Sequence, residues 1–251
     1  MLLTPAQRAR LVGAERVVIF TGAGVSQESG LGTFRGPGGM WERFRPEELA
    51  TPEAFERDPE RVWRWYAERF EAMRSARPNR AHETIARWGG RFPSLVVVTQ
   101  NVDRLHQRAG SRDVLELHGT VWEALCARCG RGSETEALLA VAGVRLPPQC
   151  PCGGRFRPAV VWFGERLPEA VLARSLDEAR RADVLLAVGT SATVWPAAGV
   201  IEQASAARAL VVEINREPSA LSELADVALT GAAGEILPAL DEELGAWPSR
   251  P

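Results

Sequence analysis

Four cysteines are the residues of this sequence with the most specific chemistry. Cys126 and Cys129 are spaced as C-x-x-C, Cys150 and Cys152 as C-x-C, and twenty residues separate the two pairs. Two thiolate pairs at this separation are typical of one tetrahedral zinc ion. Because four sulfur ligands leave no position for water, we expect the zinc to be structural. A redox function of the C-x-x-C pair is disfavoured, since nothing around it resembles a thioredoxin-like unit.

Polar residues with catalytic potential follow two short apolar runs. Asn101 and Asp103 come after Leu95–Thr99, and His118 comes after Val114–Leu117. Open α/β sheets place their active sites at the carboxyl ends of parallel strands, and an imidazole can accept a proton near neutral pH. Taken alone, Asn101 and Asp103 could equally form a turn or cap a helix, and His118 could be a buried structural histidine.

A pair of glycines follows the apolar run Val17–Phe20. Gly22 and Gly24 stand where backbone N–H groups could approach a pyrophosphate. Gln27 occupies the place of the third glycine of the G-x-G-x-x-G fingerprint, so the binding mode of a classical dehydrogenase is not supported. By itself, this pattern is compatible with either dinucleotide binding or a tight turn between a strand and a helix.

Tyr66, the only tyrosine of the chain, and Arg69 lie three residues apart in a predicted helix and therefore share one face. A guanidinium and a phenol together can hold a terminal carboxylate. The alternative is a tyrosine packed in the core beside an arginine paired with a surface acid.

These residues need a scaffold that brings strand ends together, and the hydrophobic pattern predicts one. Short apolar runs indicate buried parallel strands at Val17–Phe20, Leu95–Thr99, Val184–Val188 and Leu210–Ile214, with weaker signals at Val114–Leu117 and Val227–Leu229. Helices are expected from Thr4-Pro5 onward and over Pro168–Arg181, Pro196–Ala207 and Glu235–Leu244. Strands that alternate with helices predict an α/β fold with a doubly wound, Rossmann-like parallel sheet.

Two stretches interrupt the alternation and predict a smaller inserted domain. We assign residues 36–83 to a helical module and 120–158 to a zinc-binding module, which together form the small domain, and residues 1–35, 84–119 and 159–251 to the Rossmann-like domain. A ligand is expected in the cleft between the two domains.

Composition favours a globular enzyme and excludes other classes. The 251 residues are 45% hydrophobic and 25% charged, with a net charge of −2. The arginines are spread along the chain and form no basic stripe, so direct binding of nucleic acid is not expected. No apolar run approaches the roughly 18 residues of a membrane span, and no signal peptide is recognisable, so we expect a cytoplasmic protein without a membrane partner.

Several of these motifs resemble those of one family. The run GAGVSQESGLGTFRG, which begins at Gly22, is similar to the first signature of the sirtuins, GAGxSxxSGIPxFRG, with Gly32 where the family commonly has proline. TQNVD and LELHG, which end at Asp103 and Gly119, are similar to two further sirtuin motifs. His82 and His106 match no such motif, and we interpret them as ordinary helix residues.

The resemblance implies a site for NAD as a consumed cosubstrate. The residues that it places around NAD are Gly22, Ala23, Gly24, Ser26, Thr33, Phe34, Arg35, Trp41, Gln100, Asn101, Val102, Asp103, Gly189, Thr190, Ser191, Asn215, Glu217 and Ala233. It implies that the oxygen of an acyl-lysine attacks the ribose carbon that carries nicotinamide. Asn101 and Asp103 would orient nicotinamide and ribose, and His118 would be the general base. The products would be nicotinamide, free lysine and O-acyl-ADP-ribose.

The resemblance also implies the substrate. VVWFGE is similar to the family's substrate strand and assigns acylated lysine of proteins or peptides to Val161, Trp162, Phe163 and Gly164. Tyr66 and Arg69 resemble the Tyr-x-x-Arg pattern of class III sirtuins, which prefer succinyl and malonyl lysine, and the small Ala50 agrees with it.

Other functions stay open at this level. Plain deacetylation or mono-ADP-ribosyl transfer would use the same fold. From a different class, the chain could be a non-catalytic module that binds zinc and NAD, although such a module would not need Asn101, Asp103 and His118 together. A redox dehydrogenase is the least favoured alternative, because the mechanism that the resemblance implies moves no hydride.

Overall fold

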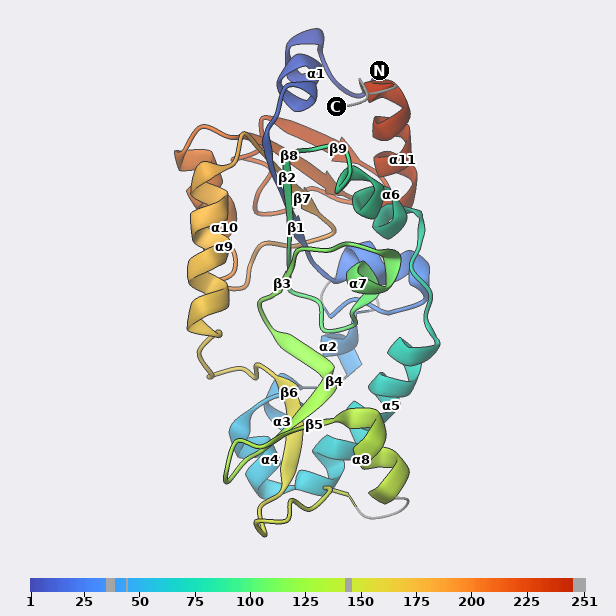
Figure 1. Cartoon of the computed structure of the whole chain (residues 1–251), viewed down its shortest axis with the longest axis vertical. Coiled ribbons are helices and arrows are strands. Elements are labelled where there is room, and N and C mark those ends of the chain that lie inside the picture. The colour runs from blue at the N-terminus through green and yellow to red at the C-terminus, as the bar shows by residue number, and fades with distance from the viewer. Residues whose placement is uncertain (35–38, 44, 143–145, 246–251) are drawn as a thin grey trace.

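The structure is a computed structural model that describes residues 1–34, 39–43, 45–142 and 146–245. It has a larger domain built around a parallel sheet and a smaller domain below it in Figure 1. Within the described residues, no helix has the length and apolarity needed to cross a membrane.

The larger domain contains a parallel sheet with the strand order β3-β2-β1-β7-β8-β9. Its strands are β1 (Arg16–Thr21), β2 (Ser94–Thr99), β3 (Val114–Glu116), β7 (Val184–Val188), β8 (Leu210–Asn215) and β9 (Val227–Thr230). Five of the six predicted apolar runs lie entirely in these strands, and the run Val114–Leu117 extends one residue beyond β3. The order reverses at β1, whose neighbours are β2 and β7, and in such sheets a ligand binds beyond the strand ends at this point.

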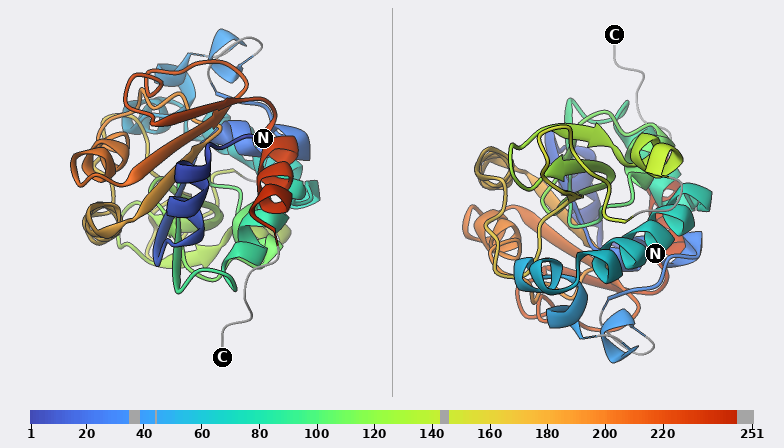
Figure 2. Two further views of the ribbon diagram at one scale, coloured as in Figure 1. Left: turned by 90° about the horizontal axis from the view of Figure 1, so that it is seen from above. Right: turned by 90° about the horizontal axis from the view of Figure 1, so that it is seen from below.

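Helices cover both faces of this sheet, as the view from above shows (Figure 2). One face packs against α1 (Pro5–Val12), α6 (Arg80–Trp88) and α11 (Ala233–Leu244), and the other against α9 (Glu169–Arg181) and α10 (Gly199–Ala206). Two short elements, the 3-10 helix η1 (Ala23–Ser29) and α7 (Leu105–Ala109), follow β1 and β2. The doubly wound α/β architecture predicted from the sequence is therefore confirmed.

The small domain combines helices with an antiparallel sheet in the order β5-β4-β6. Its elements are α2 (Met40–Arg43), α3 (Pro46–Leu49), α4 (Pro52–Arg57), α5 (Pro59–Ser75), β4 (Gly119–Cys126), β5 (Gly132–Glu134), α8 (Thr135–Ala142) and β6 (Phe156–Val160). Side-chain caps start two of the helices, since Thr51 Oγ1 accepts from Ala54 N and Asp58 Oδ1 accepts from Arg61 N. One hydrophobic cluster joins the helical and zinc-binding modules.

Two predicted boundaries differ from the structure. The limit at residue 83 falls inside α6, and α6 packs against α11 of the larger domain, because its buried face carries Ile85 and Trp88 into that core. The third predicted helix starts at Gly199 and not at Pro196, since residues 195–198 form turns before α10.

Candidate active site

A cavity of about 730 Å³ opens at the carboxyl ends of the central strands and reaches the small domain. From the larger domain it is lined by Gly22, Ala23, Gly24, Thr33, Phe34, Gln100, Asn101, Val102, His118, Gly189, Thr190, Ser191, Asn215 and Glu217. Opposite them lie Ala50, Tyr66, Arg69, Val161, Trp162, Phe163 and Gly164. The cavity thus brings together most of the residues proposed from the sequence for cofactor and substrate.

The glycines after β1 are required by a close contact with the loop after β7. A Cβ on Gly22 would lie 2.8 Å from the carbonyl oxygen of Gly189, and a Cβ on Gly24 would lie 2.7 Å from the Gly189 Cα. Gly189 itself has a φ of +59°, which L side chains rarely adopt. The two loops therefore form one continuous floor of backbone under the cavity.

Asn101 and Asp103 are held at the end of β2 by hydrogen bonds to Ser26 of η1. Asn101 Nδ2 donates to the Gly22 carbonyl at 3.1 Å and to Ser26 Oγ at 3.2 Å, and Ser26 Oγ donates to Asp103 Oδ2 at 2.8 Å. Burial raises the pKa of the Asp103 carboxyl, while hydrogen bonds from Leu105 N–H and Ser26 oppose that shift. The three side chains form a hydrogen-bonded polar corner in a second cavity of about 360 Å³, which shares Asn101, Phe34 and Arg69 and four other lining residues with the first.

His118 lies between the two domains, two residues after β3 and directly before β4. Its Nδ1 is 3.0 Å from the Gln100 carbonyl oxygen. Because a carbonyl only accepts, Nδ1 carries the proton and the lone pair is on Nε2. Burial lowers the pKa of this imidazole, and the bond to Gln100 opposes the shift. His118 is thus neutral at pH 7 and has a free base nitrogen at the cavity.

Arg69 is half-buried and forms no salt bridge with a carboxylate among the described residues, although the nearby charge of Asp103 favours its protonated form. Its guanidinium lies 4.8 Å from the ring centres of both Phe34 and Trp65, and Nη1 contacts Met40 Sδ at 2.8 Å. Nε has no hydrogen-bond partner among the described residues, and none of their salt bridges involves Arg69. Burial lowers the pKa of Arg69 to about 10, so the group stays charged at neutral pH.

Tyr66 lies beside Arg69 with its hydroxyl toward Trp162. Trp162 Nε1 donates to Tyr66 Oη at 3.0 Å, which leaves the phenolic O–H free to donate. Burial raises the Tyr66 pKa to about 12, so the phenol is neutral. One donor hydroxyl and one cation therefore lie at the same end of the cavity.

The segment after β6 forms the rim of the cavity nearest to His118. Val161 N donates to the His118 carbonyl at 3.0 Å, and Phe163 N donates to the Ala50 carbonyl at 2.9 Å. Glu165 accepts from Trp162 N at 2.8 Å and forms a salt bridge with Arg157. These bonds connect the proposed substrate segment to both domains.

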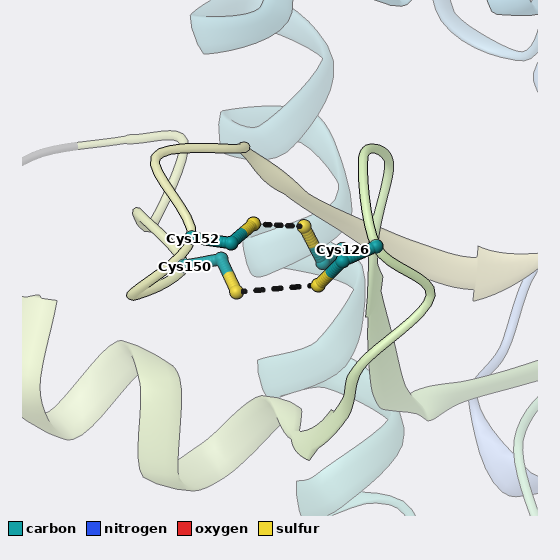
Figure 3. Close-up of side chains that lie close together, drawn as sticks. Cys126, Cys150 and Cys152 are labelled. Carbon is teal, nitrogen blue, oxygen red and sulfur yellow. Dashed lines mark hydrogen bonds between the residues drawn. The ribbon is translucent and has the colours of Figure 1, made fainter.

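The four cysteines come together in the small domain. Figure 3 shows Cys126 on one segment facing Cys150 and Cys152 on another. All four sulfur atoms lie within 4.8 Å of one another, with Cys126 to Cys152 at 3.5 Å and Cys129 to Cys150 at 3.8 Å. Zn–S bonds of about 2.3 Å in a tetrahedron require sulfur atoms about 3.8 Å apart, so the four side chains fit one zinc ion. Gly154 is needed here, since a Cβ would lie 2.7 Å from Cys126 Sγ.

Comparison with known proteins identifies the family. A family model described as the Sir2 family matches residues 22–196. The chain belongs to the Sir2 family. The NAD-dependent protein deacylase 2 of Pyrobaculum aerophilum is 53% identical over 235 residues, with 93% of each chain covered. The NAD-dependent protein deacylase 1 of Pseudomonas aeruginosa is 49% identical, with 92% of this chain and 94% of the relative covered.

Solved Sir2 structures share the complete fold. A Sir2 homologue in complex with NAD has a TM-score of 0.87 and 43% identity, and the alignment covers 96% of this chain and 94% of the homologue. A Sir2 complex with a p53 peptide and NAD+ has a TM-score of 0.86 and 31% identity, with 96% and 98% covered. NAD is therefore the cofactor of this Sir2 protein, and the cysteine cluster is its site for one structural zinc ion.

Five of the residues predicted to contact NAD do not line the large cavity within the described part of the chain. Arg35 lies outside the described residues, and the side chain of Trp41 is not described. Ala233 is buried at the start of α11 and lines neither cavity. Ser26 and Asp103 line only the second cavity, behind the floor of the first.

The loop after β7 contributes residues that sequence reasoning missed. Trp195 and Pro196 line the large cavity, and the Trp195 side chain is 61% exposed. The only available signal was their position a few residues after Gly189-Thr190-Ser191, and that position alone does not reveal which side chains turn toward the cavity. Leu167 lines the cavity as well, from the segment before α9.

Zinc is expected to support activity through β4, which runs from Gly119, next to His118, to the ligand Cys126. Along it, Val121 N donates to the Val102 carbonyl at 3.2 Å and Trp122 Nε1 donates to the Asp103 carbonyl at 3.1 Å. Binding of structural zinc contributes roughly 10–16 kcal/mol in small zinc modules. We expect chelation to lower deacylase activity at least about tenfold while the parallel sheet stays folded.

The measurement is hydrogen exchange of backbone amides together with activity and bound metal. Amides of β4 should exchange faster after chelation, amides of β1 and β7 should not, and added zinc should restore activity. Full activity in protein shown to be free of metal would contradict this coupling.

Proposed function

We propose that this enzyme is an NAD-dependent lysine deacylase that prefers acyl groups ending in a carboxylate, such as succinyl and malonyl. The observation that carries the preference is Arg69, a half-buried cation at the cavity that forms no salt bridge with any of the described carboxylates and whose Nε has no hydrogen-bond partner among them. A buried charge without a partner costs stability, and an anionic ligand would remove that cost. A neutral acetyl group would leave the cation unpaired.

The position of Tyr66 supports the same preference. Its free O–H and the Arg69 guanidinium can donate to the two oxygens of one carboxylate. Aromatic rings of Phe34 and Trp65 hold the guanidinium plane in place, so little side-chain freedom is lost on binding. Ala50 leaves space at the same wall.

The residues of the site have separate roles in this reaction. Bound NAD would supply the electrophilic ribose carbon, which would bond to the acyl oxygen as its bond to nicotinamide breaks. Asn101 and Asp103 orient the nicotinamide riboside from the corner that they form with Ser26. His118 takes a proton from a ribose hydroxyl through Nε2, while Nδ1–H stays bonded to the Gln100 carbonyl. The apolar wall formed by Trp162 and Phe163 shields the acyl group from water.

The lowered pKa of His118 predicts the acid limb of the pH profile. The neutral imidazole is the active base, so kcat/KM falls as the pH drops through the His118 pKa, which lies below 6.5. We expect most of the activity to be present at pH 7 and the midpoint of the acid limb to lie below that of an ordinary histidine. An acetylated peptide should be used beside a succinylated one, because only the latter carries a carboxylate of its own. An acid limb centred above pH 7 with both peptides would contradict the prediction.

The proposed function is tested by one competition experiment. Equal amounts of a peptide carrying succinyl-, malonyl- or acetyl-lysine are incubated with enzyme and NAD, and mass spectrometry follows each deacylated peptide and each O-acyl-ADP-ribose. We expect succinyl and malonyl peptides to be consumed first, with one nicotinamide released per lysine. Preferred consumption of the acetyl peptide would reject the carboxylate preference.

A further inference from the structure

Two buried histidines pack against each other behind the strand ends that carry the active site. His82 of α6 and His106 of α7 have ring centres 4.8 Å apart at an angle of 58°. Their side chains are 0% and 1% exposed, and neither contributes to the lining of either cavity. The roles derived so far for NAD, acyl-lysine and zinc use neither histidine.

A chain of hydrogen bonds runs from His106 to the backbone of Asn101. His106 Nε2 is 3.0 Å from Thr21 Oγ1, Thr21 Oγ1 donates to Thr99 Oγ1 at 2.8 Å, and Thr99 Oγ1 accepts from Asn101 N at 3.0 Å. Because the Thr21 hydroxyl donates its only hydrogen to Thr99, it can only accept a hydrogen bond from His106. This direction fixes the proton of His106 on Nε2.

Asn101 N–H depends on this chain, since its bond to Thr99 spans only two residues and lies where β2 has already ended. The Asn101 side chain then reaches Gly22 and Ser26 across the cavity floor. A change in the backbone conformation at Asn101 would therefore displace its side-chain amide, to which we assign the orientation of the nicotinamide riboside.

His82 supports the opposite side of the same corner. His82 Nδ1 lies 3.0 Å from Asn79 Oδ1, and Asn79 Nδ2 donates to the Val25 carbonyl at 2.8 Å and to Ser29 Oγ at 3.1 Å. Val25 and Ser29 flank Ser26 in η1. The histidine pair is thus connected to both segments that hold Asn101. His106 reaches β1 through Thr21, and His82 reaches η1 through Asn79.

We propose that His106 is a positioning residue for deacylation, which holds Asn101 in place through Thr21 and Thr99. Neither His106 Nδ1 nor His82 Nε2 has a hydrogen-bond partner among the described residues. An apolar side chain of similar size at position 106 would therefore leave one fewer buried polar atom without a partner. The Nε2–H bond to Thr21 is what an apolar side chain could not supply. Burial lowers the pKa of His106, consistent with a neutral donor.

Two matched pairs of variants test this role. His106→Leu fills the space without a donor, and His106→Gln offers an amide N–H in its place. Thr21→Val cuts the chain with the shape kept, and Thr21→Ser keeps the hydroxyl. We expect His106→Leu and Thr21→Val to lower kcat by about ten- to hundredfold, as a misplaced reacting group does, and the Gln and Ser variants to recover most of it.

Hydrogen exchange of the Asn101 amide distinguishes positioning from general loss of stability. That amide should lose protection in His106→Leu and in Thr21→Val. Ile85→Ala, a core change on α6 away from the strand ends, should lower the melting temperature but leave the protection of the Asn101 amide unchanged. If His106→Leu does not fold, the kcat and the Asn101 protection of Thr21→Val test the proposal instead. The proposal would be overturned if the Asn101 amide kept its protection in His106→Leu and Thr21→Val. It would also be overturned if these two variants had the same kcat as Ile85→Ala. The ratio of succinyl to acetyl activity should stay constant throughout, which separates this role from the carboxylate preference.

Discussion

Replacement of His118 by alanine is expected to lower kcat for deacylation by about 10²–10⁴-fold, the range that general acid–base catalysis contributes. His118 is the one imidazole that lines the large cavity within the described part of the chain, and its Nε2 is the free base nitrogen. Burial keeps this group neutral at pH 7, so its removal takes away a base that is ready to act. Binding of NAD should change little, because the floor formed by Gly22, Gly24 and Gly189 stays intact.

His118→Asn is the matched control, because its amide can still donate to the Gln100 carbonyl but cannot act as a base. Both variants should show the same low kcat in a steady-state assay of nicotinamide release, with melting temperatures close to that of the original protein. Activity of His118→Asn within about threefold of the original would show that His118 acts through its hydrogen bond and not as a base.

Replacement of Arg69 by methionine is expected to lower kcat/KM for a succinylated peptide by about ten- to hundredfold. Hydrogen bonds to a charged group contribute about 1.5–3 kcal/mol, and each 1.4 kcal/mol corresponds to a factor of ten. The acetylated peptide should lose much less, since it offers no carboxylate to Arg69. The protein should not be destabilised, because the variant replaces a half-buried cation that forms no salt bridge with a carboxylate among the described residues.

Tyr66→Phe is the companion variant for the second donor. It should reduce succinyl activity by a smaller factor than Arg69→Met, since it removes a neutral hydroxyl and not a charge. Trp162 Nε1 loses its acceptor in this variant, so its melting temperature must be measured as well. Equal losses on succinyl and acetyl peptides in Arg69→Met would show that Arg69 supports the fold and does not select the acyl group.

The sequence allowed the sheet to be predicted because parallel strands are buried on both faces and therefore consist of apolar runs. Val184–Val188 and Leu210–Ile214 lie in β7 and β8 in full. The spacing of the cysteines predicted the zinc site for a similar reason, since ligand geometry restricts the spacing of such pairs. The limit predicted at residue 83 falls inside α6, because the apolar pattern of an amphipathic helix does not reveal against which domain it packs.

The site could be predicted only as a set of residues and not as a network. Nothing in the spacing of Ser26, Asn101 and Asp103 shows that they bond to each other, because these contacts span 75 and 77 residues of chain. The sequence also does not reveal that Arg69 forms no salt bridge with any described carboxylate, because an acid three or four residues away is a common partner in a helix. His82 and His106 lie in helices, as the sequence predicts, but their spacing does not show that the two rings pack against each other behind the active site.

The charge preference of the cavity is tested most directly with two peptides that differ by one isosteric change. One peptide carries succinyl-lysine. In the other, the same acyl group ends in a carboxamide in place of the carboxylate. We predict that kcat/KM for the carboxylate exceeds that for the carboxamide by about ten- to hundredfold and that Arg69→Met abolishes the difference. Equal kcat/KM values for the two peptides in the original enzyme would contradict the account.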